Sequence, residues 1–252
     1  MSAVTVVTGA GQGIGAATAR QLAAAGTRLV LVDLRPEGIT TLASDLDVAH
    51  PVDGGHLIAP LDVTDAAAVA AFGALLASGG LRVAGVVSAA GIISRGAAEH
   101  FERAAWDLHL AVHLTGAFTL LQVLHPLMGP GSSVVNIASV GSTFGLPGRI
   151  AYTTAKSGIL GLTRTLASEW GRQGIRVNAV APGYVRTEMV LSGLRAGTLD
   201  ESSLVARTPL GRLAEPDEIA RAIRFLLSDD AAFINGATLR VDGGLTIDGA
   251  FD

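Results

Sequence analysis

The sequence predicts an α/β fold: a doubly wound parallel β-sheet with helices on both faces. Short β-branched runs alternate with longer helical patterns from the first residues onward, which is typical of strands joined by crossover helices. Most of these runs are continuously apolar, as expected of strands buried on both faces. The chain has 252 residues, a length that one such sheet commonly uses, so we expect a single domain over residues 1–252.

The strands are predicted from short runs rich in valine, isoleucine and leucine. The first run reads Val-Thr-Val-Val-Thr and the second Arg-Leu-Val-Leu-Val-Asp, and the later runs have a similar composition. We expect strands at residues 4–8, 28–33, 57–61, 83–88, 133–138, 176–181 and 238–242.

The helices are predicted from Ala-rich or helical patterns between these runs. The first follows a glycine-rich turn, and a later one carries leucines at helical spacing that suit a core or a subunit interface. We expect helices at about residues 14–25, 65–78, 103–127, 151–172 and 216–228. The segment 184–214 breaks the alternation, because it is long, rich in Gly, Ser and Thr, and only weakly periodic. Such an excursion is typical of a lid over a binding site.

Composition and charge argue against several function classes. Lys and Arg number 18 against 22 Asp and Glu, and no run of basic residues occurs, so we expect no nucleic-acid partner. The chain has no cysteine, so redox chemistry would need a bound cofactor. We expect a cytoplasmic protein without a membrane segment, because no basic leader precedes the first strand and the uncharged, mostly Ala, Gly and Ser stretch 66–81 is too short to span a bilayer.

A glycine-rich turn follows the first strand and reads Thr-Gly-Ala-Gly-Gln-Gly-Ile-Gly over residues 8–15. Glycine lets backbone N–H groups and a helix N-terminus approach a pyrophosphate, because a Cβ would block that approach. No Lys-Ser or Lys-Thr closes the run, which disfavours a mononucleotide loop. We therefore predict a Rossmann-type dinucleotide site, although a purely structural turn has the same glycines. The residues assigned to it here are Gly9, Gln12, Gly13, Ile14 and Gly15.

Two carboxylates follow later strands of the predicted sheet. Asp33 ends the second strand, where a carboxylate meets the adenosine ribose of a dinucleotide. A carboxylate about 4 Å from a 2′-phosphate would oppose it by up to roughly 4 kcal/mol at an effective dielectric of 20, so Asp33 favours NAD over NADP. The alternative is that Asp33 caps the next helix. Asp62 would contact adenine, with Val63 beside it, or serve only as a structural acid.

Tyr152 and Lys156 carry the predicted chemistry. They lie four residues apart on a helical pattern and so share one face, and Ser139 ends the preceding strand. Removing a hydride from an alcohol carbon requires a base for the hydroxyl proton, and a tyrosinate serves if its pKa falls from about 10 toward neutrality. A lysine ammonium and the positive nicotinamide would favour that phenolate. Taken alone, such a pair is usually a surface feature.

In these motifs the sequence resembles the short-chain dehydrogenase/reductase family over essentially its whole length. The matching elements are the glycine turn, Ser139, Tyr152 with Lys156, the segment Asn-Ala-Val-Ala-Pro-Gly at 178–183, Thr187, and Val-Asp-Gly-Gly at 241–244. The resemblance implies Tyr152 as general acid/base, Lys156 as ribose ligand and pKa modifier, and Ser139 as substrate orienter. It also implies a lid from Tyr184 to Arg212 and a homotetramer. The further residues assigned to the cofactor are Ala90, Gly91, Pro182, Gly183, Val185 and Thr187.

Two departures from the family pattern stand out. The chain reads Ser-Ala-Ala-Gly over 88–91, where the family commonly has Asn-Asn-Ala-Gly, so a sheet-stabilising amide is missing. His113 stands where the family usually has a fourth catalytic Asn, and its imidazole would leave a proton relay intact, pass protons itself, or be a packed core histidine. His109 and His113 could grip a metal from one helical face, but no acid lies between them and we expect no metal.

The sequence thus predicts an NAD-dependent enzyme that interconverts a small secondary alcohol and its ketone. The alternatives are an NADH-binding sensor or structural subunit with weak catalysis, and a reductase of 3-oxoacyl thioesters. The intact trio of Ser139, Tyr152 and Lys156 favours the enzyme, because a binding module has no reason to keep it. A moderately apolar substrate pocket is expected from Ile92, Ile93, Leu146, Tyr184 and Val190.

Overall fold

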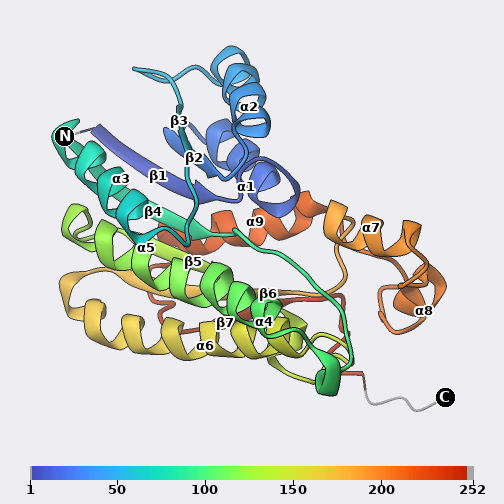
Figure 1. The fold of residues 1–252 in the computed structure, drawn as a ribbon. Helices are drawn as coiled ribbons and strands as arrows, with labels where there is room; N and C mark the ends of the chain where they lie inside the picture. The colour runs from blue at the N-terminus through green and yellow to red at the C-terminus, as the bar shows by residue number, and fades with distance from the viewer. Residues whose placement is uncertain (1, 249–252) are drawn as a thin grey trace.

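A single sheet of seven strands organises the computed structural model, which describes residues 2–248 (Figure 1). The strand order is β3-β2-β1-β4-β5-β6-β7, and every neighbouring pair is parallel. The strands are β1 Ser2–Thr8, β2 Leu29–Asp33, β3 Leu57–Pro60, β4 Leu81–Ser88, β5 Ser133–Ile137, β6 Arg176–Pro182 and β7 Thr238–Val241. The order reverses between β1 and β4, so a crevice opens at the carboxyl ends of these two strands. The predicted doubly wound parallel sheet is confirmed.

The strands form where the sequence predicts them, with ends within two residues of the expected positions. The central strands are mostly apolar because helices cover both of their faces; all five residues of β5 are buried. The edge strand β3 instead alternates between half-buried and exposed residues.

Two layers of helices enclose the sheet. On one face α1 (Gly13–Ala24), α2 (Pro36–Ala49) and α9 (Pro216–Leu227) pack against alternate residues of β1, β2, β4, β5 and β6. On the other face α3 (Ala66–Ser78), α5 (Gly116–Leu124) and α6 (Ile150–Trp170) bury their apolar stripes. Helix α4 (Arg103–Leu110) lies beside α6 (Figure 1).

Helix α2 is absent from the set of helices that the sequence analysis predicts. It buries Ile39, Leu42, Ala43 and Leu46 against the sheet, the spacing of one helical face. Gly38 and two threonines weaken its helix propensity, so packing against the sheet stabilises it more than local preference does.

The predicted helix over 103–127 is continuous but not uniform. A π-helical turn at Ala111–Thr115 joins α4 to α5, and a 3-10 turn at His125–Leu127 ends the run. This helix, Arg103–Leu127, is long and apolar enough to cross a membrane by length and composition. Its leucines Leu120, Leu121 and Leu124 are, however, fully buried against the sheet. We therefore interpret it as a core helix.

The excursion over 184–214 contains two short helices, α7 (Glu188–Arg195) and α8 (Glu201–Ala206), which project from the body of the molecule (Figure 1). Both were missed, because elements of eight and six residues have little intrinsic stability. The two ends of the excursion lie together: Val185 and Ala214 form an isolated parallel bridge, and the Arg186 N–H donates to the Ala214 carbonyl at 2.8 Å.

Candidate active site

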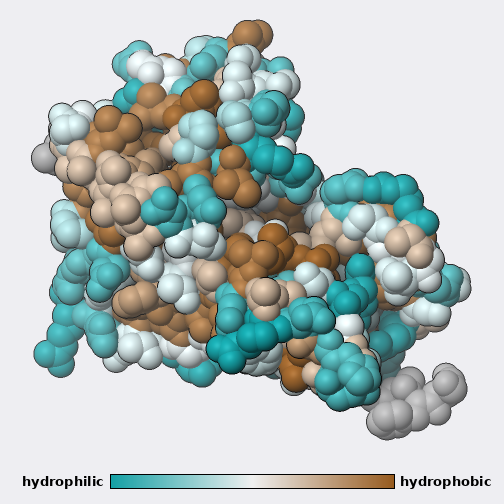
Figure 2. Space-filling view, in the orientation of Figure 1, coloured by the Kyte–Doolittle hydropathy of each residue, from teal (hydrophilic) through white to brown (hydrophobic). Residues whose placement is uncertain are grey.

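All of the predicted site residues line one cavity of about 480 Å³ at the carboxyl edge of the sheet. Figure 2 shows apolar surface gathered in the hollow between the body of the molecule and the projecting α7–α8 segment. The cavity is lined by Gly9, Gln12, Gly13, Ile14, Gly15, Asp33, Asp62, Val63, Ala90, Gly91, His113, Ser139, Tyr152, Lys156, Pro182, Gly183, Val185 and Thr187. The five residues expected to make it moderately apolar, Ile92, Ile93, Leu146, Tyr184 and Val190, also line it.

The glycine turn between β1 and α1 has no room for side chains. A Cβ on Gly15 would lie 2.7 Å from the Gly9 carbonyl carbon and closer still to its oxygen, and Gly9 itself has a φ of +64°. The N-cap of α1, Gln12, makes no side-chain capping bond, so the first N–H groups of that helix stay available to a ligand. The turn therefore fits the pyrophosphate of a dinucleotide.

The two carboxylates differ in their bonding. Asp33 accepts the Gly11 N–H at 3.0 Å through Oδ2 and the Arg35 N–H at 3.1 Å through Oδ1, so it ties the glycine turn to the end of β2. The N-cap of α2 is Arg35, so Asp33 does not itself cap that helix. Asp62 accepts the Thr64 N–H and hydroxyl through Oδ1, a local turn like those that acidic residues form at strand ends.

Thr8 is a structural part of the site that the sequence analysis did not single out. Its hydroxyl accepts the N–H groups of Ala89 and Ala90 at 3.0 and 3.1 Å. It therefore holds the segment after β4 against the end of β1, close to where the missing amide at Ser88 was noted. A polar residue at the end of the first buried strand was the signal that could have revealed it.

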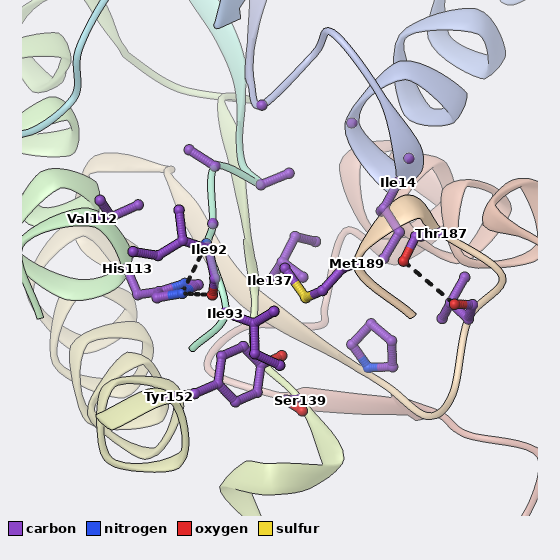
Figure 3. Close-up of a pocket in the computed structure, with 18 of the residues that line it drawn as sticks. Ile14, Ile92, Ile93, Val112, His113, Ile137, Ser139, Tyr152, Thr187 and Met189 are labelled. Carbon is purple, nitrogen blue, oxygen red and sulfur yellow. Dashed lines mark hydrogen bonds between the residues drawn. The ribbon is translucent and has the colours of Figure 1, made fainter. Parts of the chain in front are cut away.

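Ser139, Tyr152 and Lys156 meet at the substrate end of the cavity. Figure 3 shows the Tyr152 ring beside Ser139, whose side chain lowers the pKa of the Tyr152 phenol. The Lys156 ammonium is buried, donates to the Ile137 carbonyl at 2.6 Å, and lies 5.8 Å from the centre of the Tyr152 ring. The helical spacing thus brings the two side chains together on one face of α6, as expected.

The protein groups alone do not make Tyr152 acidic; the expected acidification depends on the lysine ammonium together with the positive nicotinamide. Burial raises the pKa of the Tyr152 phenol, and the hydrogen bond with Ser139 and the charge of Arg149 only partly oppose this. Burial also lowers the pKa of the Lys156 ammonium from 10.5 to about 7. Desolvation disfavours both charged forms in a site without a carboxylate beside them.

His113 lies at the centre of the π-helical turn and is buried. Its Nε2 is 2.8 Å from the Ile92 carbonyl oxygen and 3.2 Å from the Ile92 nitrogen (Figure 3). Burial, aided by the Lys156 charge, lowers the pKa of His113 well below its usual 6.5, so the ring stays neutral. Its Nδ1 and the Ser88 hydroxyl have no hydrogen-bond partner among residues 2–248, and both residues line a small cavity of about 10 Å³.

The His109 ring is hydrogen-bonded to backbone groups and does not share a ligand with His113. Its Nδ1 lies 2.7 Å from the Ala105 carbonyl, and its Nε2 accepts the Ser94 N–H at 3.0 Å. Both ring nitrogens therefore have partners already. In the part of the chain that the structure describes, no group of three or more His, Asp or Glu side chains is placed to hold a metal.

The end of β6 leads directly into the wall opposite His113 and Tyr152. The N–H of Gly183 donates to the Val241 carbonyl at 3.1 Å. A Cβ on Gly183 would lie 2.8 Å from the Asp242 Cα atom. Thr187 precedes α7 and lies close to Gly13, so the excursion reaches back to the glycine turn. Figure 3 shows Thr187 with Met189 across the cavity from Tyr152.

Several further lining residues were not predicted, and four of them bear on the substrate end of the cavity. Arg95 follows β4 in the chain, and Arg149 immediately precedes α6; Met189 and Leu199 come from the excursion. Arg149 is the N-cap of α6 and lies outside its helical pattern, so that pattern does not reveal it. Arg95 and Leu199 are single residues in irregular segments, and Met189 lies in α7, which is too short to show a clear periodicity.

A family model described as Enoyl-(Acyl carrier protein) reductase matches residues 9–246 of the chain. An uncharacterized short-chain type dehydrogenase/reductase of Sinorhizobium fredii is 44% identical over 96% of this chain, which spans only 43% of that relative. The D-threitol dehydrogenase of Mycolicibacterium smegmatis is 41% identical, covering 97% of this chain and 93% of the relative. The cis-4-hydroxycyclohexanecarboxylate dehydrogenase of Sinomonas cyclohexanicum is 43% identical, covering 96% of each.

Solved structures share the whole fold. The crystal structure of a putative NAD(P)-dependent gluconate 5-dehydrogenase from Beutenbergia cavernae, with NADP bound at low occupancy, superposes with a TM-score of 0.90. It is 36% identical to this chain and covers 98% of it, and this chain covers 97% of that protein.

Proposed function

The chain belongs to the short-chain dehydrogenase/reductase family of oxidoreductases, and from this premise we propose that it transfers a hydride between NAD(H) and a small secondary alcohol or ketone. The observation that carries the proposal is the meeting of Ser139, Tyr152 and Lys156 in the same cavity as the glycine turn. The names of the relatives, which include a sugar alcohol and a ring alcohol, support the substrate class.

The side chains have distinct roles in the proposed reaction. The Tyr152 hydroxyl gives its proton to the substrate oxygen during reduction and takes it back during oxidation. The Ser139 hydroxyl donates to the same oxygen and orients it. Lys156 binds the ribose and, when charged, favours the phenolate. The nicotinamide, when bound, supplies or accepts the hydride and adds a positive charge in its oxidised form, which would counter the effect of burial on the Tyr152 pKa.

The remaining proposals concern the other parts of the cavity. Gly9 to Gly15 would hold the pyrophosphate, Asp33 the ribose, and Pro182 to Thr187 the nicotinamide. The neutral imidazole of His113 would hold the Ile92 backbone in place. A proton relay at this point would then pass through backbone groups and not through the imidazole. The excursion would act as a lid, and we propose a cytoplasmic homotetramer in line with the family resemblance.

Oxidation of NADH by ketones tests the proposed function. We expect steady oxidation, followed by the loss of NADH fluorescence, with at least one member of a panel of cyclic and acyclic ketones. Omission of ketone is the control for slow background oxidation. Binding of NADH without turnover of any ketone would instead favour the alternative of a sensor. Turnover confined to 3-oxoacyl thioesters would favour the acyl-thioester reductase, an alternative in keeping with the description of the matching family model.

Substitution of Asp33 tests the choice of NAD over NADP. The carboxylate lies at the end of β2 beside the exposed Arg35, which also lines the cavity. In Asp33→Ala the repulsion of a 2′-phosphate is gone while the cation remains, so we expect the ratio of kcat/KM for NADP to that for NAD to rise at least tenfold. The ratio is measured because loss of the bond to Gly11 affects both cofactors.

Asp45→Ala is the matched control for this change. Asp45 is exposed on α2, pairs with Arg20 at 3.7 Å and does not line the cavity. Its variant should keep the parental ratio. A ratio that is the same in Asp33→Ala as in the parent would show that Asp33 does not read the ribose.

A further inference from the structure

Two arginines line the substrate end of the cavity without an acidic partner. Arg95 lies in the loop between β4 and α4, and Arg149 is the N-cap of α6. Six arginines form ion pairs with carboxylates, and Arg95 and Arg149 are among those that form none within residues 2–248. Arg149 donates only to the Pro147 carbonyl at 3.2 Å. Two cations are therefore left facing a largely apolar cavity.

Arg95 is the more poorly satisfied of the two. Its Nε is buried and has no hydrogen-bond partner in the described part of the chain. Burial, together with the nearby charge of Arg149, lowers the pKa of its guanidinium, although an arginine remains charged at any working pH. A buried donor on a cation is costly to leave unpaired, so its presence in a cavity calls for an explanation.

The carboxylates that line the cavity do not neutralise this pair. Glu188 is bound to Arg195 within α7. Asp33 and Asp62 follow β2 and β3, and neither forms an ion pair with Arg95 or Arg149. The positive charge at the substrate end is thus uncompensated within the described residues.

The two guanidinium groups flank the reacting groups. Arg149 lies near enough to Tyr152 for its charge to act on the phenol. Arg95 reaches across to the excursion, where its Nη2 would lie 2.7 Å from a Cβ placed on Gly193 of α7. Gly193 is buried and leaves the space that the Arg95 head occupies. Between them the walls are the apolar side chains of Ile92, Ile93, Leu146, Val190 and Leu199.

We propose that Arg95 and Arg149 form an anion subsite in the cavity. The substrates of the reaction proposed above would then be a hydroxy acid and the corresponding oxo acid, each with a small, mainly apolar body and a carboxylate. The proposal rests on the proposed function and adds the charge of the substrate to it. Guanidinium groups bind carboxylates through paired N–H donors, and the apolar walls offer no further donors of the kind that a phosphate dianion needs.

A matched pair of substrates tests the subsite. The acid is 4-oxocyclohexanecarboxylate and the neutral partner is 4-oxocyclohexanecarboxamide, which has nearly the same shape. With NADH and low salt, we expect kcat/KM for the acid to exceed that for the amide at least tenfold. The preference should shrink as salt is raised, because screening weakens the charge interaction at a partly open site.

Variants locate the effect. In Arg95→Gln and in Arg149→Gln the ratio of kcat/KM for acid to amide should fall at least fivefold, because glutamine keeps a polar head but carries no charge. Arg172→Gln is the control: Arg172 is exposed beyond the far end of α6, about 30 Å of helix from Arg149, and its loss removes the same charge. Circular dichroism and the melting temperature show that each variant is folded.

Binding separates this proposal from the proposed function. Titration calorimetry compares cyclohexanecarboxylate with cyclohexanecarboxamide on the NADH-loaded protein, whether or not any ketone turns over. Tighter binding of the acid to the parent, lost in both variants but kept in Arg172→Gln, supports the subsite even if no ketone is reduced. Equal binding of acid and amide, or equal kcat/KM for the two ketones, overturns it while leaving hydride transfer intact.

Discussion

Tyr152→Phe is expected to lower kcat at least a hundredfold while changing the Kd for NADH little. The substitution removes only the phenolic oxygen, so the ring still fills its place beside Ser139 and the cavity keeps its shape. A positioned proton donor contributes on the order of 10² to 10⁴ to a rate. Stopped-flow oxidation of NADH gives kcat, and fluorescence titration gives the Kd.

Thr153→Val is the control for this change. Thr153 is the next residue on α6, its hydroxyl donates to the Arg149 carbonyl at 3.0 Å, and it does not line the cavity. The variant loses a hydroxyl of the same helix without altering the reacting groups, so kcat should stay within about twofold of the parent. If Tyr152→Phe and the parent turn over equally fast, another group must handle the proton.

Gly15→Ala is expected to abolish measurable NADH binding and to lower the melting temperature. The added methyl group would collide with the backbone of Gly9, and backbone cannot rotate away as a flexible side chain does. Gly9 is itself packed against Ala89, where a Cβ would lie 2.8 Å from the carbonyl oxygen, so the turn has no free direction in which to move. Overpacking of this kind typically costs 1–3 kcal/mol or more. Fluorescence titration and thermal unfolding measure the two effects.

Gly129→Ala serves as the matched glycine variant. Gly129 has open space around its Cβ position and does not line the cavity. Its variant should bind NADH as the parent does and melt within a degree or two of it. Parental affinity in Gly15→Ala would mean that the close approach of the turn is not what a dinucleotide uses.

The sheet was predictable because burial on both faces imposes continuous apolar runs. All seven strands lie within two residues of their expected ends, and the helices that follow long patterns also appear. Helix α2 was missed although Ile39, Leu42, Ala43 and Leu46 have helical spacing, because Gly38 and two threonines obscure the pattern. Helices α7 and α8 depend on tertiary contacts that no local pattern records.

The site was predictable where it depends on motifs and unpredictable where it depends on folding. The glycine turn and the Tyr152–Lys156 pair are local motifs, and their order along the predicted strands and helices predicts their placement. Arg95 and Arg149 come from separate loops, and each alone resembles an ordinary solvated surface charge. The effect of burial on Tyr152 and Lys156 was also hidden, because desolvation depends on everything packed around a group.

The bridge between Val185 and Ala214 has a consequence for how this scaffold can diversify. The bridge holds the two ends of the excursion over 184–214 side by side, so a replacement segment of any length needs to close only that one short gap. The entropy of closing a loop grows slowly with its length, about 0.6 kcal/mol for each doubling. The excursion is therefore an exchangeable cassette: grafting one from a relative would transplant the roof of the cavity while the sheet and the glycine turn stay as they are.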